Sequence, residues 1–422
     1  MPSSSLTAFA QDMTDTGQLD VSVVSAATAA PVADAQVSIA YTGDPSGAIE
    51  QLTTDNNGQT EAVSLPAPPV EYSLNPDRPQ PYSEYTLTIT APGFDPFQVS
   101  GVEVLPLITS LYQARLRPRT RPAEESLYVI GPHTLYGDYP PKIAETEIKP
   151  VQESGEIVLS RVVVPETIVV HDGPPTDRSA SDYYVSYKDY IKNVASSEIY
   201  ATWPDAAIRA NILAIMSFTL NRVYTEWYRN RGYNFTITSS TAFDHKWIPG
   251  RNIFDTISLV VDEIFADYLS RPGVRQPILT QYCDGRRVSC PNWLSQWGSK
   301  SLADDGYSTI DILRYYYGDS MYINTAEEIA GIPASWPGSD LTVGSTGAKV
   351  LQMQEQLNAI ANVYTSIPKI AEDGIFGSDT AAAVRQFQSI FGLGATGIVD
   401  YPTWYKISEI YVGISRIAEL NP

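Results

Sequence analysis

Residues 203–227, WPDAAIRANILAIMSFTLNRVYTEW, contain the strongest helical signal in the middle of this chain. Pro204 suits the first position of a helix, where no backbone N–H is needed, and the acid after it favours a helix start. The residues that follow are apolar on almost every side, and a helix of that kind is buried at the centre of a domain. The sequence therefore predicts a buried central helix that starts at Pro204.

Apolar residues at helical spacing continue on both sides of this stretch. They predict a helix at 187–199, an amphipathic helix at 253–269 and a helix at 309–317, with strand-like residues at 277–282. A mixture of this kind predicts an α+β domain over residues 167–333.

Residues 19–118 follow another pattern, with short segments in which apolar and polar residues alternate. A period of two is typical of half-buried strands, so this part predicts an all-β sandwich. The expected strands are 20–24, 35–40, 85–90, 97–102 and 111–116. Between them Gly58 is able to take the positive φ of a hairpin turn. The turns at 31–35 and 91–94 resemble those of transthyretin-type, carboxypeptidase-regulatory-like modules, which implies a regulatory module and no chemistry.

Residues 119–166 carry prolines without a sustained period, and such a stretch is too long for a loop within one domain. We interpret it as a Pro-rich connector, either a linker or a segment that is cut, and expect one protease-sensitive activation site between about 119 and 160. Residues 1–18 predict a flexible segment without the basic and apolar regions of a secretory signal peptide. No run reaches the ~18 apolar residues that span a bilayer, so no membrane partner is expected.

The last block, residues 341–412, follows a short linker at 334–340 and precedes a tail at 413–422. Its motifs are VGSTGAKVLQMQEQL (343–357), DGIFG (373–377), AAAVRQFQ (381–388) and TGIVD (396–400). Their order resembles the three-helix peptidoglycan-binding domain found at the ends of cell-wall hydrolases. The resemblance implies that peptidoglycan is a partner.

The composition of the chain argues against several classes of partner and catalytic site. The 48 acidic and 28 basic residues give a formal net charge of −20, which repels nucleic acid. The three histidines, His133, His171 and His245, lie far apart without paired spacing, so neither a Ser-His-Asp triad nor a His-rich metal site is expected. We predict no metal and no cofactor. The 27 Tyr and 7 Trp suit carbohydrate, although rings also fill ordinary cores.

Glu198 is the most informative acid of the middle block, because apolar and aromatic residues surround it next to the central helix. Burial disfavours the charged carboxylate, so it raises the pKa and keeps a proton available for general acid catalysis. On the residues alone a structural role competes with this one, in which Glu198 caps the central helix or pairs with Arg209.

A family resemblance bears on these alternatives. Glu198 with WPDAAIRAN after it, then LSQWGSKSLADDGY (294–307) and ILRYYY (312–317), resemble the stage II sporulation protein D (SpoIID) family of lytic transglycosylases over residues 185–318. The resemblance implies that Glu198 is the catalytic acid, and it suggests that the cleft is lined by Ser295, Gln296 and Trp297.

The chain departs from the family pattern at two places. The family's E-M-P reads Glu198-Ile199-Tyr200 here, and Cys290 stands where the family has the His of H-G-x-G-M-S-Q, so any role of that His is lost or replaced. Cys283 and Cys290 bracket a turn before the cleft residues. A disulfide that clamps the cleft loop is the preferred interpretation, with free thiols or a zinc site with His245 as alternatives.

Aromatic residues flank the proposed acid and cleft loop. The candidates for stacking on sugar rings are Tyr200, Trp203, Trp293 and Trp297. The alternative is that these rings are packed in the hydrophobic core.

The order of the domains resembles that of SleC-type spore cortex-lytic enzymes of clostridia. Those enzymes are made as inactive precursors and are cut in the connector by subtilisin-like germination proteases. The resemblance implies a lytic transglycosylase located in the spore cortex or coat, which cleaves the bond between N-acetylmuramic acid and N-acetylglucosamine and leaves a 1,6-anhydromuramic product. Two other hypotheses remain, a prophage or tail-associated wall lysin and an inactive peptidoglycan-binding spore scaffold.

Overall fold

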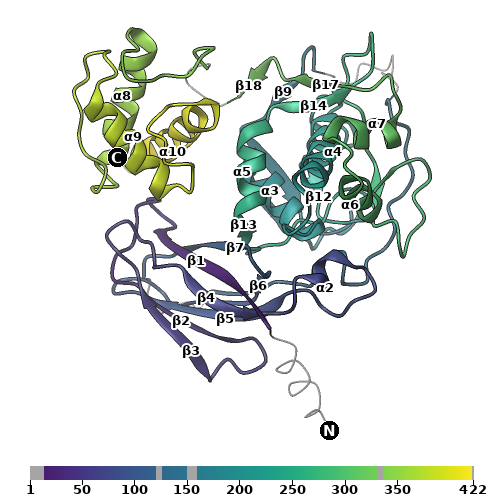
Figure 1. Cartoon of the computed structure of the whole chain (residues 1–422), viewed down its shortest axis with the longest axis horizontal. Coiled ribbons are helices and arrows are strands. Elements are labelled where there is room, and N and C mark those ends of the chain that lie inside the picture. The colour runs from purple at the N-terminus through teal and green to yellow at the C-terminus, as the bar shows by residue number, and fades with distance from the viewer. Residues whose placement is uncertain (1–13, 120–125, 150–158, 331–335, 421–422) are drawn as a thin grey trace.

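The computed structural model describes residues 14–119, 126–149, 159–330 and 336–420. In Figure 1 the N-terminal strands lie beneath both the mixed middle domain and the C-terminal helices. Within the described residues no helix combines the length and the apolar character needed to cross a membrane.

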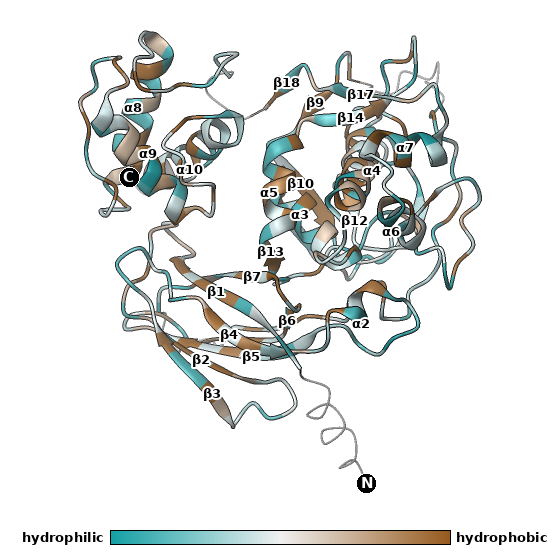
Figure 2. Ribbon diagram, in the orientation of Figure 1, coloured by the Kyte–Doolittle hydropathy of each residue, from teal (hydrophilic) through white to brown (hydrophobic). Residues whose placement is uncertain are grey.

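The N-terminal part contains two sheets, with strand orders β13-β7-β1-β4 and β3-β2-β5-β6-β8. Their bounds are β1 Asp15–Ser25, β2 Gln36–Tyr41, β3 Ala48–Thr53, β4 Val63–Ala67, β5 Ser83–Thr90, β6 Phe97–Val104, β7 Thr109–Leu116, β8 Ser126–Val129 and β13 Ile253–Phe254, with a short helix α2 at Glu71–Leu74. Inward side chains of both sheets form one hydrophobic cluster, which includes Val21, Ile39 and Leu87. Figure 2 shows this hydrophobic character along β1 and β5.

All five predicted strands are present, and the sequence missed β3 and β4. Strand β3 is exposed along nearly its whole length, so it has no apolar alternation to detect. Gly58 has φ +72°, and a Cβ there would lie 2.4 Å from the Val23 carbonyl oxygen. That position therefore requires glycine.

Two predicted boundaries of the N-terminal part are wrong. Strand β1 begins at Asp15, so residues 15–18 belong to the sheet and not to a flexible segment, while residues 1–13 lie outside the described residues. Strand β8 comes from the predicted connector and pairs in parallel with β6. Residues 126–129 of the connector therefore belong to the N-terminal sheet, because their backbone pairs with the edge of that sheet.

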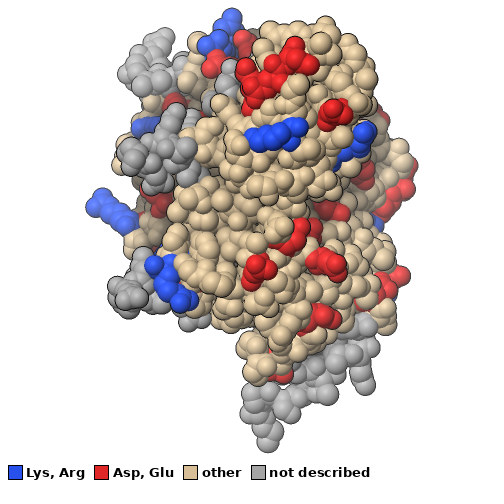
Figure 3. Space-filling model, turned by 90° about the vertical axis from the view of Figure 1, so that its left-hand side faces the viewer, with Lys and Arg blue, Asp and Glu red and all other residues tan. Residues whose placement is uncertain are grey.

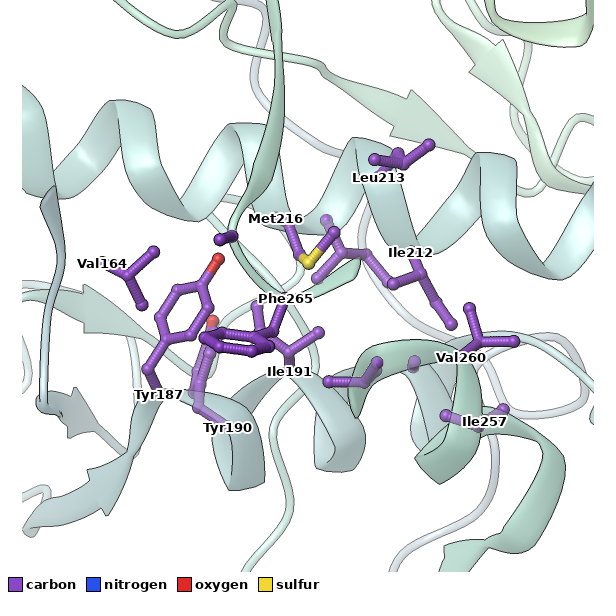
Figure 4. Packing of buried hydrophobic residues seen from close by; sticks show 14 of the residues in the cluster. Val164, Tyr187, Tyr190, Ile191, Ile212, Leu213, Met216, Ile257, Val260 and Phe265 are labelled. Atoms are coloured by element: carbon purple, nitrogen blue, oxygen red, sulfur yellow. The ribbon is translucent and has the colours of Figure 1, made fainter. Parts of the chain in front are cut away.

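The middle domain is built around α4, which spans Asp205–Tyr224 and is buried along almost its entire length. The other helices are α3 Tyr187–Glu198, α5 Asp255–Ile264, α6 Gln296–Asp304, α7 Thr309–Tyr317 and the 3-10 turn η1 Arg229–Arg231. The strands are β9 Val163–Val164, β10 Thr167–His171, β11 Asp182–Ser186, β12 Ile237–Thr238, β14 Asp267–Ser270, β15 Tyr282–Cys283, β16 Leu294–Ser295, β17 Tyr322–Thr325 and β18 Glu328–Ile329. Figure 4 shows Tyr187, Tyr190 and Ile191 of α3 against Ile212 and Met216 of α4.

The predictions for α3, α4 and α7 are confirmed within a residue or two, whereas the helix predicted at 253–269 is present only at 255–264, as α5. That range divides into β13, α5 and β14, because Ile253 and Phe254 pair with β7 of the N-terminal sheet. Of the predicted strand at 277–282, only Tyr282 lies in a strand, β15. The middle and N-terminal parts thus share one sheet.

The C-terminal domain consists of α8 Ala348–Ala361, α9 Ser378–Ile390 and α10 Tyr401–Leu420. Buried Gln354 accepts from the Gly374 N–H at 2.8 Å and donates to the Ile375 carbonyl, and buried Gln388 holds the TGIVD turn in the same way. These glutamines explain the motifs, since each one satisfies a tight turn that packs on a helix.

The predicted linker and tail need correction. Helix α10 continues to Leu420, so residues 413–420 are helical rather than a loose tail, because the apolar spacing of the helix continues. Trp336, from the predicted linker at 334–340, packs against Tyr401 and Trp404. Residues 331–335 and 421–422 lie outside the described residues.

Ion pairs with low exposure join the domains. The Glu103 and Arg251 side chains are 1% and 0% exposed and lie 2.6 Å apart, between the N-terminal sheets and the middle domain. At the other junction Lys188 of α3 pairs with Asp262 at 3.1 Å and with Glu409 of α10. Truncating one partner of such a pair leaves a buried charge, so these contacts make each junction sensitive to substitution.

Glu103 predicts a pH effect on stability. Burial raises the pKa of Glu103 from its ordinary value of 4.5 to about 7, although Arg251 opposes that rise. The folded state binds the Glu103 proton more tightly than the unfolded chain does. The protonated side chain therefore stabilises the fold fully below pH about 4.5, and this stabilisation is lost as the pH rises through about 7. We expect the stability of Glu103→Gln relative to the unaltered chain to rise by up to about 3 kcal/mol from pH 4 to pH 8.

Thermal melts of both proteins across that pH range measure the difference. Glu50→Gln, on the exposed strand β3, is the control and is expected to show no such slope. A difference between Glu103→Gln and the unaltered chain that stays constant with pH would contradict the prediction.

Candidate active site

Glu198 is the last residue of α3 and is only 3% exposed. Ser186 caps the start of the helix, with its side chain accepting from the Asp189 N–H, and the helix ends where Ile199 becomes extended. Oε1 of Glu198 accepts from the Lys246 backbone N–H at 2.6 Å, and Oε2 accepts from the Tyr282 hydroxyl. Both carboxylate oxygens are therefore engaged.

Burial raises the pKa of Glu198, while the Lys142 ammonium, the Lys246 N–H and the Tyr282 hydroxyl oppose that rise. The direction agrees with the sequence argument for a general acid. Neither structural alternative holds in the structure, because Glu198 does not cap α4 and Arg209 instead binds Asp205 and Glu263.

A row of rings stands behind Tyr282. The His245 ring stacks on it with centroids 5.7 Å apart, and the Tyr190 hydroxyl lies 3.0 Å from His245 Nδ1. Burial lowers the pKa of His245 well below its ordinary value, helped by Lys142 and Arg222, so the ring is neutral. A neutral ring packed on its face fixes the orientation of Tyr282 toward Glu198.

A cavity of about 480 Å³ opens beside Glu198. One wall comes from the middle domain and consists of Thr241, Tyr282, Cys283, Asp284, Arg287, Val288, Ser289 and Gln296. The other comes from the connector and consists of Thr134, Asp138, Tyr139, Pro140, Pro141 and Lys142. Hydroxyl, amide and charged groups converge there on a buried carboxyl group, an arrangement typical of a catalytic site.

The three predicted cleft residues occupy different environments in the structure. Gln296 lines the cavity, and its amide donates to the Glu198 carbonyl at 3.1 Å. Ser295 is the N-cap of α6, with its side chain accepting from the Gly298 N–H. Trp297 is 8% exposed and faces Trp203 with centroids 5.0 Å apart.

The prediction of sugar-stacking rings does not fit the structure. Tyr200 and Trp203 are 2% and 3% exposed and lie edge to face, and Trp297 packs against both. These three rings belong to the buried core where α6 meets the turn between α3 and α4, so none offers a face to a sugar. Trp293 is half-buried and is not part of the cavity lining.

Cys283 and Cys290 form a disulfide in the structure, around the loop that edges the cavity. Asp284 accepts from the backbone N–H groups of Arg287 and Val288 at 3.1 and 3.0 Å, which orders the same loop. The zinc alternative has no support, because both sulfur atoms are bonded to each other and the described residues contain no cluster of potential metal ligands.

The disulfide predicts a measurable stabilisation. Closing a loop with a sequence separation of 7 residues restricts the unfolded chain, so Cys283→Ser with Cys290→Ser is expected to lose about 2 kcal/mol. Thermal melts with and without reductant measure the effect, and the double variant is the control that reductant leaves unchanged. Mass spectrometry showing two free thiols in the unreduced protein would contradict the bridge.

Sequence reasoning missed Tyr282, Lys246 and Lys142. Each is a single residue from a separate segment, and no spacing connects them to Glu198. The contacts arise only when the connector and the 240–246 loop close over the end of α3.

Comparison with known proteins gives one family match, in which residues 346–407 fit the model for "Putative peptidoglycan binding domain". Over 76 residues the chain is 40% identical to the zinc D-Ala-D-Ala carboxypeptidase of Streptomyces albus G, a match that covers 18% of this chain and 28% of the relative. The chain thus spans less than a third of the length of that curated relative.

Solved structures resemble only parts of the chain. The Bacillus anthracis TIE protein matches at 13% identity and a TM-score of 0.19, over 25% of this chain and 17% of its own. Klebsiella pneumoniae 5-hydroxyisourate hydrolase matches at 16% identity and a TM-score of 0.16, over 24% and 92%. TM-scores this low do not identify the fold of the N-terminal or the middle domain. What the comparisons do support is a C-terminal peptidoglycan-binding domain, with peptidoglycan as its binding partner.

Proposed function

We propose that this chain is a lytic transglycosylase that degrades the peptidoglycan of the spore cortex during germination, and that it is made as a precursor activated by a subtilisin-like protease. The observation that carries the proposal is a buried carboxyl group, Glu198, at the edge of a polar cavity in a chain that also has a peptidoglycan-binding domain. In this proposal the protein is located in the cortex or coat of the spore.

The proposed reaction needs one carboxyl group. Glu198 donates its proton to the glycosidic oxygen between N-acetylmuramic acid and N-acetylglucosamine, and the C1–O bond breaks with its electron pair on the leaving sugar. The carboxylate then takes the proton of the muramic C6 hydroxyl, whose oxygen bonds to C1 and closes the 1,6-anhydro ring. Glu198 therefore ends protonated, as it began, and the next cycle needs no proton from solvent.

Neighbouring groups support both steps. The Lys246 N–H and the Tyr282 hydroxyl hold the carboxyl in one orientation, and they stabilise the carboxylate after it has lost its proton. Burial works in the opposite direction and favours the protonated acid. A carboxyl group balanced between these influences suits a residue that acts first as an acid and then as a base.

The charge of the protein is consistent with a cortex substrate. The face in Figure 3 carries scattered Asp and Glu side chains, fewer Lys and Arg, and broad uncharged areas between them. A formal charge of −20 is repelled by walls that carry teichoic acids, and less by a cortex whose muramic lactam leaves fewer free carboxylates. Binding to lactam-free sacculi as strong as binding to cortex at low salt would argue against this part of the proposal.

The test is to incubate the protease-trimmed chain with decoated spores and with vegetative sacculi, and to identify the muropeptides released. We expect 1,6-anhydro products from cortex. Equal digestion of vegetative sacculi would favour a prophage or tail-associated lysin, and binding without any cleavage would favour an inactive scaffold.

A further inference from the structure

The segment 131–149, here called the strap, crosses the face of the middle domain at Glu198. Its first part is anchored at His133, which is fully buried and lies 3.2 Å from the carbonyl oxygen of Ile199, the residue after Glu198. The strap therefore begins directly beside the end of α3.

The last part of the strap runs along residues 276–281 of the middle domain. Ile143 donates its N–H to the Ala242 carbonyl at 2.7 Å and accepts from the Gln281 amide at 2.7 Å. Further along, the Glu147 carbonyl accepts from the Leu279 N–H at 3.0 Å, and Lys149 donates its N–H to Gln276 at 2.6 Å. Hydrogen bonds at both ends thus hold the strap in place over the cavity.

Between these anchors the strap places Lys142 among buried groups of the site. Its ammonium donates to the Asp244 carbonyl and lies 5.0 Å from the ring centroid of Tyr282 and 5.1 Å from that of Phe218. Tyr282 is the residue whose hydroxyl bonds Glu198. The ammonium and the carboxyl group therefore contact the same tyrosine.

This arrangement restricts access to Glu198. The residue is 3% exposed, both its oxygens have protein partners, and Pro140, Pro141 and Lys142 form the opposite wall of the cavity. A glycan needs its glycosidic oxygen within hydrogen-bond distance of the acid. The strap is the element whose displacement opens that approach.

We propose that the strap is an intramolecular plug of the Glu198 site and that Lys142 is its key residue, which anchors the plug to the Asp244 carbonyl and the Tyr282 ring. The inference rests on the proposed function, because it specifies how that same site is kept inactive in the precursor. A strap seated across the cavity keeps the glycosidic oxygen of a glycan out of hydrogen-bond reach of Glu198.

Two variants test the plug in the full-length chain. Lys142→Met keeps the length of the side chain and removes its charge. Tyr139→Ala leaves Lys142 intact and removes a ring that lies 5.2 Å from the Lys246 ammonium and whose hydroxyl bonds the Pro132 carbonyl. Lys300→Met is the matched control, since Lys300 pairs with Asp304 on α6 away from the strap.

The first measurement is labelling of Glu198 by a carbodiimide and glycine amide, quantified by mass spectrometry on the folded protein. We expect each strap variant to raise labelling at least about tenfold, the change that corresponds to about 1.4 kcal/mol of lost strap binding. The control is expected to match the unaltered chain. Thermal melts verify that each variant is folded.

The second measurement is release of 1,6-anhydromuropeptides from cortex by the same proteins. Increased labelling together with increased release supports the plug. Increased labelling without release from any variant also supports the plug and overturns the proposed function instead. Unchanged labelling in both variants overturns the plug, and so does full activity of the unaltered full-length chain. Increased labelling with lower release also overturns it, because the strap would then be a working wall of the active site.

Discussion

Glu198→Gln is expected to abolish release of 1,6-anhydromuropeptides from spore cortex by the trimmed chain, with a loss of about 10²–10⁴-fold or more. The amide has the size of the carboxyl group and still accepts the Lys246 N–H, so the fold is retained. It has no acidic proton for the leaving oxygen and no carboxylate to accept the C6 hydroxyl proton. Both halves of the reaction therefore fail together.

The measurement is mass spectrometry of soluble muropeptides, with thermal melts to verify folding. Glu263→Gln is the matched control, because Glu263 lies on the surface of the same domain and pairs with half-buried Arg209. Undiminished release by Glu198→Gln would refute the assignment of the catalytic acid. Loss of binding to cortex by this variant would also count against it, since binding is assigned to the C-terminal domain.

Arg222→Leu is expected to destabilise the middle domain by about 3–5 kcal/mol, the cost of leaving buried charges without a partner. The Arg222 side chain is fully buried in α4, where its guanidinium lies 2.7 Å from Asp244, also fully buried, and bonds Glu145 of the strap. Asp244 in turn accepts from the Tyr228 hydroxyl and the Thr238 N–H. Removing the arginine leaves the fully buried Asp244 without its ion-pair partner, while Glu145 keeps its ion pair with Lys149.

Urea denaturation measures the loss of stability. Arg222→Lys retains the charge without the planar fork of donors, so it is expected to be intermediate and to remain folded. Arg209→Leu, which breaks a more exposed pair on the same helix, is expected to cost less than about 1 kcal/mol. A cost for Arg222→Leu no larger than that of Arg209→Leu would contradict a structural role for this network.

Prediction from sequence succeeded where a local pattern carries the information. The buried face of a helix or strand leaves a pattern in that element's own residues. Examples are the apolar residues of α4, the cap and spacing of α3, and the alternation along β1 and β7. Glu198 could be singled out for the same reason, because its burial follows from its apolar neighbours.

Prediction failed where a residue acts through a distant segment. Ile253 and Phe254 read as the start of a helix, yet they form β13 because an edge of the N-terminal sheet was available for pairing. Tyr200, Trp203 and Trp297 suggested a sugar site, yet they pack on one another because the turn between α3 and α4 meets α6 in the core.

The order of the domains, the central helix, the peptidoglycan-binding domain and the candidate acid could all be predicted from the sequence, because periodicity and motifs are local properties of the chain. Three features emerge only in the folded molecule: the packing of the connector as a strap, the hydrogen bond from Tyr282 to Glu198, and the position of Lys142 against the same tyrosine. Those contacts join residues far apart in the chain, and hydrogen bonds and charges act over a few ångströms of space regardless of sequence separation.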